Sequence, residues 1–269
     1  MKGGERRRPR GIPLRAVIPN AVTALALCVG LSGVRFAIAE EWERAIAAIV
    51  IAGVLDGMDG RIARALKGQS RFGAELDSLS DVIAFGVSPA IIVHLWSLQY
   101  WPRFGWMFAL AYAVCAALRL ARFNAQIDVE EQPHKSAGFL TGVPAPAAAG
   151  LMLLPIFLWE ASEGALPWLR DLTLVAPWSA LVAFLMVSNL ATFSWTSLRL
   201  RQGVRLWVIL LVALIGGALF TAPLETLSVI SILYVLSIPF SIASYAKVKR
   251  QRAAATLRGS QLAEDGPTT

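Results

Sequence analysis

The chain has 269 residues, of which 56% are hydrophobic and only 16% are charged, whereas about a quarter of the residues in a soluble domain are charged. Its net charge is +7, but the Lys and Arg residues lie in the tails and at or between the ends of long apolar runs, which is typical of contact with anionic lipid headgroups. Composition and charge therefore exclude an ordinary soluble domain, favour the lipid bilayer as a partner and argue against nucleic acid.

Residues 1–15 form a basic tail, and the apolar stretches that follow are each long enough to cross a hydrocarbon core about 30 Å thick. We predict spans at residues 16–38, 43–66, 73–97, 103–124, 143–163, 173–196, 205–222 and 225–246. The polar residues 251–269 are expected to form a disordered C-terminal tail. The predicted fold class is therefore all-α, a polytopic transmembrane helix bundle of eight spans.

The distribution of positive charge predicts how this bundle lies in the membrane. If the spans alternate in direction, 21 of the 25 Lys and Arg residues fall on the side that holds both tails. Because cytoplasmic loops are enriched in Lys and Arg, we expect a multi-pass protein of the cell membrane with both termini in the cytoplasm. The first span and its basic flank are also typical of a signal peptide, but an apolar run of about 20 residues has the length of a span.

Four aspartates interrupt the second and third spans: Asp56, Asp59, Asp77 and Asp81. An ionised carboxylate inside a span costs at least a few kcal/mol, so this cluster needs compensation. Residues three or four apart share a helix face, which pairs the first two aspartates and the last two. The short connection 66–72 makes the two spans antiparallel neighbours, so all four carboxylates are predicted to meet near the cytoplasmic surface.

Such a cluster is suited to a hard divalent cation with oxygen ligands. No His or Cys joins it, which argues against zinc and favours Mg²⁺ or Mn²⁺. Gly60 and Gly73 lie one helical turn from Asp56 and Asp77, where a missing side chain lets a ligand approach the backbone. Arg64, at the end of the second span, can hold a phosphate by paired hydrogen bonds. Metal and guanidinium around a phosphate indicate phosphoryl transfer.

The full pattern resembles the signature of the CDP-alcohol phosphotransferases, Asp56-x2-Asp59-Gly60-x2-Ala63-Arg64-x8-Gly73-x3-Asp77-x3-Asp81. The resemblance covers roughly residues 16–200, the six-helix core of that family, and leaves residues 201–250 as additional membrane helices. It implies that an alcohol displaces CMP from a CDP-linked lipid, and it implies a homodimer.

The resemblance also implies roles for individual residues. The first three aspartates would bind a pair of metal ions, and Asp81 would contribute to one ion and act as general base. Residues expected to contact the CDP-lipid are Gly60, Arg64, Ser70 and Gly73, with Asn20 and Thr23 at the start of the first span.

Two further stretches, residues 117–124 and 139–149, resemble the phosphatidylserine synthase branch, although Val143 stands where that branch usually has Leu. The branch implies CDP-diacylglycerol and L-serine as substrates, with phosphatidylserine and CMP as products. Arg119 and Arg122 share a helix face and can bind the serine carboxylate or the lipid phosphate. Asn124 and Lys135 are assigned to the same serine and phosphate site.

Alternatives remain at this point. Arginines at a cytoplasmic helix end are also ordinary topology anchors, and the position of Lys135 is equally typical of a plain surface lysine. A sister enzyme of the family would use glycerol 3-phosphate, choline or inositol as the acceptor. A cation transporter would also carry intramembrane acids, but its polar groups should follow the depth of the membrane rather than gather near one surface.

Overall fold

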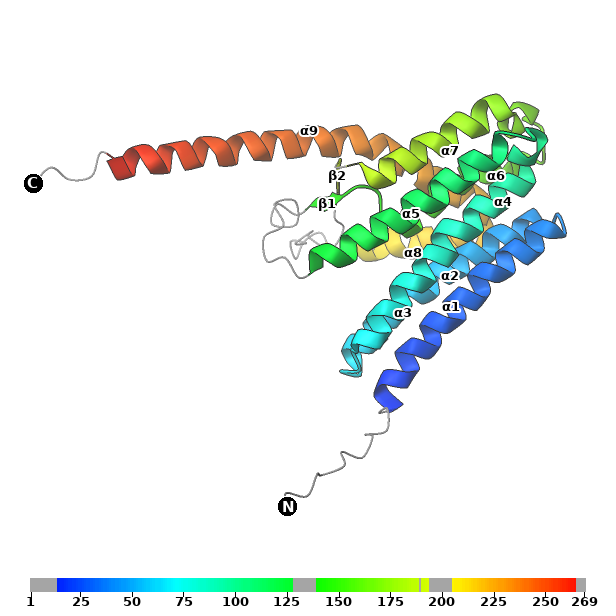
Figure 1. Ribbon diagram of the computed structural model, residues 1–269, viewed down its shortest axis with the longest axis horizontal. Coiled ribbons are helices and arrows are strands. Elements are labelled where there is room, and N and C mark those ends of the chain that lie inside the picture. Colours follow the sequence, from blue (N-terminus) through cyan, green and yellow to red (C-terminus); the bar gives the residue numbers. More distant parts are fainter. Residues whose placement is uncertain (1–13, 128–138, 189, 194–204, 265–269) are drawn as a thin grey trace, which may run out of the picture.

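A computed structural model describes residues 14–127, 139–188, 190–193 and 205–264 of the chain, which form an elongated bundle of helices (Figure 1). The first half contains α1 (Leu14–Ile38), α2 (Trp42–Ala65), α3 (Arg71–Asp81), the π-helix η1 (Val82–Val87), α4 (Ser88–Trp96), the 3-10 helix η2 (Leu98–Tyr100) and α5 (Gly105–Ile127). The second half contains β1 (Phe139–Thr141), α6 (Ala145–Ala161), the 3-10 helix η4 (Pro167–Arg170), α7 (Leu172–Val187), β2 (Ala191–Phe193), α8 (Arg205–Thr221) and α9 (Pro223–Glu264).

The helices occupy all eight predicted spans. Four described segments are long and apolar enough to cross a membrane: Val17–Ile38, Arg71–Trp96, Gly105–Ala125 and Pro223–Tyr245. Three shorter apolar helices, α6, α7 and most of α8, occupy further predicted spans, and α2 carries the charged residues of the second span. The predicted all-α, multi-pass membrane bundle is thereby confirmed.

The third span is one continuous helix from α3 through η1 to α4, and its middle turn is widened into a π-helix. Pro89 has no N–H to donate to the carbonyl of Phe85 four residues earlier, which is the usual cause of a helix irregularity. The carbonyl of Phe85 instead accepts a hydrogen bond of 2.9 Å from the hydroxyl of Tyr112 on α5. The irregular turn therefore ties the third span to the fourth directly beyond Asp81.

Helix α6 forms the centre of the bundle. Its residues Leu151, Met152, Leu153 and Ile156 are at most 1% exposed, so side chains on every face of the helix are buried. It contacts α2, α4, α7 and α9, while α1 packs along α2 and α3. The connections α1–α2, α4–α5 and α6–α7 lie at one end of the bundle, and the α2–α3 connection lies at the opposite end (Figure 1).

The sixth span ends earlier than the predicted range 173–196. Helix α7 ends at Val187, and β2 then pairs antiparallel with β1, with Leu140 opposite Thr192. The last carbonyls of a helix lack intrahelical partners, and here they find others. Val187 O accepts from Arg122 Nη1 at 3.3 Å, and Leu185 O accepts from the N–H of Val143 at 3.4 Å. These tertiary bonds allow the helix to stop.

The C-terminal region also differs from the prediction. Helix α9 runs to Glu264, so residues 251–264, expected to be disordered, are helical, while 265–269 lie outside the described part of the chain. The stretch 251–258 reads Gln-Arg-Ala-Ala-Ala-Thr-Leu-Arg, and all of these residues except Thr favour helices. Helical propensity therefore extends the eighth span beyond its apolar section, and α9 projects from the bundle (Figure 1).

Candidate active site

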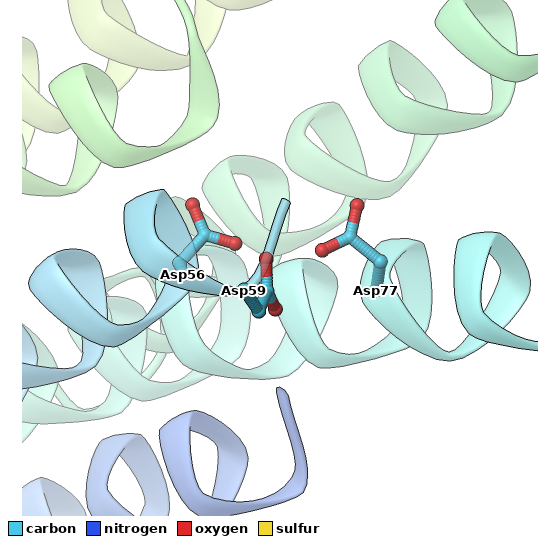
Figure 2. A group of neighbouring side chains, drawn as sticks. All are labelled: Asp56, Asp59 and Asp77. Carbon is cyan, nitrogen blue, oxygen red and sulfur yellow. The ribbon is translucent and has the colours of Figure 1, made fainter. Parts of the chain in front are cut away.

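Three carboxylates converge where α2 meets α3. Asp56, Asp59 and Asp77 each offer one oxygen, and these three oxygens lie within 4.8 Å of one another. Figure 2 shows the carboxylates of Asp56 and Asp77 pointing toward each other from the two helices, with Asp59 between them in this view. The helix spacing and the short connection thus bring together the residues that the sequence pattern singled out.

Asp81 extends the cluster by one helical turn. Its carboxyl group lies within hydrogen-bond reach of Asp56. Asp81 Oδ1 is buried and has no hydrogen-bond partner among the described residues. Burying an oxygen without a hydrogen-bond partner costs free energy. A cluster of oxygen ligands with no nitrogen or sulfur ligand among them suits a hard divalent cation. The aspartate cluster therefore fits the class of metal ion expected from the sequence.

Thr23 on α1 orients one of the carboxylates. Its Oγ1 lies 2.5 Å from Asp59 Oδ2 and 3.1 Å from the carbonyl oxygen of Pro19. A hydroxyl carries one proton, so Thr23 donates to one of these oxygens at a time. Both Thr23 and Asp59 are buried, at 4% and 6% exposure, which keeps water from competing for this contact. The first span thereby supports the aspartate cluster.

A cavity of about 340 Å³ opens beside the aspartates. All six residues predicted to contact a CDP-lipid line it: Asn20, Thr23, Gly60, Arg64, Ser70 and Gly73. Asp59 and Asp77 form part of the same lining, so the cavity connects the carboxylates with the exposed side chain of Arg64. A polyanionic group in this cavity would contact both.

The wall formed by the start of α3 depends on Gly73. Ser70 caps the helix by accepting a hydrogen bond of 3.0 Å from the N–H of Gly73. A Cβ at position 73 would lie 2.7 Å from Asn20 Oδ1 and 3.1 Å from Ser70 Oγ, which is too close. At Gly60, by contrast, the nearest atom to such a Cβ would be Arg64 Nη1 at 3.9 Å. Gly73 therefore permits close packing, and Gly60 leaves room inside the cavity.

The predicted acceptor residues on α5 separate into three environments. Arg119 is partly buried, its Nε has no hydrogen-bond partner among the described residues, and it interacts electrostatically with Asp81. Asn124 Nδ2 donates to Ser78 Oγ at 2.8 Å, next to Asp77. Arg122 donates to the end of α7. The structure therefore brings Arg119 and Asn124 to the aspartates, and it places Arg122 at a helix terminus.

One predicted site residue lies outside the described chain, and one residue at the site was not predicted. Lys135 lies outside the described residues. A side chain that the sequence did not single out also approaches the site, Ser78 on α3, whose hydroxyl accepts a hydrogen bond from Asn124. The position of Ser78 directly after Asp77 was a signal in the sequence.

Comparison with known proteins identifies similar sequences over most of the chain. Residues 16–188 match the family described as CDP-alcohol phosphatidyltransferase. A CDP-diacylglycerol–serine O-phosphatidyltransferase of Mycobacterium bovis is 37% identical over 242 residues, which cover 90% of this chain and 83% of the relative. Proteins of the same name are 35% identical in Mycobacterium leprae, covering 84% of this chain and 74% of the relative, and 32% identical in Helicobacter pylori, covering 82% and 88%.

The contact between Thr23 and Asp59 generates a prediction about metal affinity. Thr23→Val keeps the shape of the side chain but removes the hydroxyl that orients the carboxylate, so Mn²⁺ should bind about tenfold more weakly. Titration of the purified protein with Mn²⁺, followed by electron paramagnetic resonance, measures this. The matched control is Thr221→Val, because the Thr221 hydroxyl also bonds a carbonyl four residues earlier, Gly217 O at 3.1 Å. Equal Mn²⁺ affinity in both variants would show that Thr23 does not support the aspartates.

Proposed function

The chain belongs to the CDP-alcohol phosphatidyltransferase family, and on this premise we propose that it transfers the phosphatidyl group of CDP-diacylglycerol to L-serine. The products are phosphatidylserine and CMP. The observation that carries the proposal is the aspartate cluster, which opens into a cavity lined by Arg64 and three glycines and has the partly buried Arg119 near Asp81. The names of the relatives in mycobacteria and Helicobacter pylori support serine as the acceptor.

The cavity is the proposed binding site of the CDP group. Arg64 holds a phosphate by paired hydrogen bonds, and Gly60 leaves space for the phosphates against α2. Asn20 and Ser70, which lie next to Gly73 in the lining of the cavity, offer polar groups to the nucleotide. When bound to the aspartates, one or two Mg²⁺ or Mn²⁺ ions neutralise charge on the phosphate oxygens.

The acceptor is proposed to bind between α3 and α5. Arg119 Nε is buried and has no hydrogen-bond partner within the part of the chain that the structure describes, so an anionic group there would supply the missing hydrogen bond. The carboxylate of serine is such a group, whereas choline and inositol have none. Glycerol 3-phosphate is also anionic, and it is the acceptor that an experiment must compare directly with serine.

Asp81 is the proposed general base. It accepts the proton of the serine hydroxyl while the serine oxygen bonds to the phosphorus of the phosphatidyl group. The bond from that phosphorus to the CMP oxygen breaks, and CMP leaves with the electron pair. The proposal is supported by the position of Asp81 beside Asp56 and one helical turn after Asp77, which lines the cavity.

The proposed orientation puts both termini and the site on the cytoplasmic face. Arg35, Arg44, Arg103 and Arg170 belong to the end of the bundle that holds the α1–α2, α4–α5 and α6–α7 connections (Figure 1). The start of α1, the end of α9 and the α2–α3 connection lie toward the other end, and the other Lys and Arg residues of the described chain belong to these segments, to the end of α5 or to the start of α8. The positive-inside rule assigns that second end to the cytoplasm.

A substrate panel tests the proposed reaction. The purified protein in liposomes that contain CDP-diacylglycerol should release CMP with L-serine, and should release far less with glycerol 3-phosphate, choline or inositol. Excess chelator should abolish the release, and Mg²⁺ or Mn²⁺ should restore it, because the ligands are carboxylates. Faster release of CMP with another alcohol would show that this alcohol, and not serine, is the acceptor. Full turnover in excess chelator would show that the reaction does not need a metal ion.

The role of Asp81 has its own prediction. Asp81→Asn keeps the shape of the side chain but removes the basic oxygen, so turnover should fall at least about a hundredfold while metal-dependent binding of CDP-diacylglycerol persists. Asp56→Asn is the matched comparison, since it removes a predicted metal ligand and should weaken that binding itself. Near-normal turnover by Asp81→Asn would assign the base to another group.

The orientation is tested with reporter fusions. An alkaline phosphatase, active only outside the cytoplasm, should be inactive after Thr269 and active when inserted at Arg170. The physical reason is the concentration of positive charge at the end of the bundle that holds the tails. The opposite pattern would place the aspartates on the outer face, where CDP-diacylglycerol and serine are not expected.

A further inference from the structure

The third span changes its helix type directly after Asp81. The N–H of Ser88 donates to the carbonyl of Ile83, five residues earlier instead of four, so the π-helix η1 contains one residue more than a regular turn. Each residue of an α-helix turns the chain by about 100°. The extra residue therefore offsets the side-chain faces of α3 and α4 by about that angle from their positions in an unbroken α-helix.

This offset matters because both helices present a face with a fixed position. On α4, Ile92 and Trp96 are 0% exposed in the core of the bundle. On α3, Asp77 belongs to the cluster of three carboxylates, and Asp81 follows one turn later on the same face. If η1 became a regular helix while α4 stayed packed, α3 would have to turn by about 100°, and the face that carries Asp81 would leave the cluster.

A hydroxyl group on α5 supports the π-helix. Because Pro89 has no N–H, the carbonyl of Phe85 lacks the partner that a regular α-helix would give it. Tyr112 is 0% exposed and donates its phenol proton to this oxygen at 2.9 Å. The next residue, Gly86, lies so near α5 that a Cβ there would be 2.8 Å from the Cβ of Ala116. The hydrogen bond and the close packing together hold η1 against α5.

Helix α1 holds the same segment through different contacts. Ser80 Oγ, directly before Asp81, donates to the carbonyl oxygen of Thr23 at 3.3 Å. A Cβ at Gly30 would lie 2.8 Å from the Cβ of Ala84, so α1 and η1 are in close contact. Two helices therefore fix the backbone on both sides of Asp81 in the sequence.

The start of α3 is attached independently of η1. Ser70 caps the helix, and Ser78 accepts a hydrogen bond of 2.8 Å from Asn124 on α5. Asp77 is adjacent to Ser78 and is therefore held by these attachments. Asp81, which adjoins η1, is the member of the cluster whose position depends most on the π-helix.

We infer that Tyr112 is a positioning residue for Asp81, because its hydroxyl holds η1 in the form that keeps Asp81 on the face of α3 shared with Asp77. Tyr112 acts through the backbone of the third span and not on the substrate. This inference rests on the proposed function, in which Asp81 is the general base. It gives a buried tyrosine in the apolar half of the bundle a part in the reaction.

The test is Tyr112→Phe, which retains the ring and removes only the hydroxyl. The kcat for serine-dependent release of CMP should fall about tenfold, since a small displacement of a reacting group slows the chemical step. The KM values for CDP-diacylglycerol and L-serine and the affinity for Mn²⁺ should stay within about twofold, because Asp77 is held by other contacts. A loss of packing alone would lower thermal stability without this selective loss of kcat.

The matched control is Ser97→Ala. The Ser97 hydroxyl is also 0% exposed and donates to a carbonyl on another element, Arg170 O at 2.7 Å, at the other end of the bundle. This variant should lower the melting temperature about as much as Tyr112→Phe does and leave kcat within about twofold. An equal loss of kcat in both variants would overturn the inference, as would a kcat within twofold of the unsubstituted protein in Tyr112→Phe.

A second variant keeps the inference testable if Tyr112→Phe does not fold. Pro89→Ala restores an N–H that can pair with the carbonyl of Phe85 inside a regular helix, so it competes with the Tyr112 hydroxyl for that oxygen. Alanine favours helices, so the protein should remain folded while kcat falls severalfold. An unchanged kcat in Pro89→Ala would show that the π-helix does not position Asp81.

The unsubstituted protein, assayed in parallel, separates this inference from the proposed function. Its release of CMP with serine tests the proposed function. The ratio of the kcat of each variant to that of the unsubstituted protein, measured with whichever alcohol gives the fastest release, tests the role of Tyr112.

Discussion

Four carboxylates toward one end of an apolar helix bundle are the constraint on which the rest of this structure depends. Each would lose hydration on leaving water, and together they repel one another. Polar contacts from several surrounding helices offset part of this cost. Thr23 on α1 contacts Asp59, Asn124 on α5 bonds Ser78 beside Asp77, and Arg119 on α5 lies near Asp81. In a purely lipid-facing bundle, packing alone would hold the helices together. Here polar contacts also join the helices at one end of the bundle.

This arrangement divides the molecule into two functional halves. Around α6 the bundle is apolar and closely packed, which gives a rigid support. At the ends of α2 and α3 it opens into the cavity that includes Arg64. The π-helix η1 lies at the boundary, immediately after Asp81, where the hydrogen bond from Tyr112 to Phe85 anchors it. Irregular helical turns are frequent at functional sites, and this one connects the reactive carboxylate to the rigid half.

Local signals in the sequence were sufficient to predict the helix bundle and the convergence of the aspartates. The spacing of Asp56 and Asp59, that of Asp77 and Asp81, and the short connection between their spans leave few other arrangements. The early end of α7 was not predictable in this way, because it depends on bonds from Arg122 and Val143, which are distant in the sequence. The helical continuation of α9 was missed for a different reason, since polarity was read as disorder although the residues favour helix.

The β1–β2 ladder has a consequence for how the protein is made. Its strands, at residues 139–141 and 191–193, are separated by α6 and α7, which leave one end of the bundle and return to it. The strands cannot meet until both helices have been inserted into the bilayer, so the ladder closes late in biogenesis. Closing a loop of this length before the helices pack would cost chain entropy without a compensating gain. During translation, the half of the chain that carries the aspartates can therefore reach the membrane well before this side of the bundle is complete.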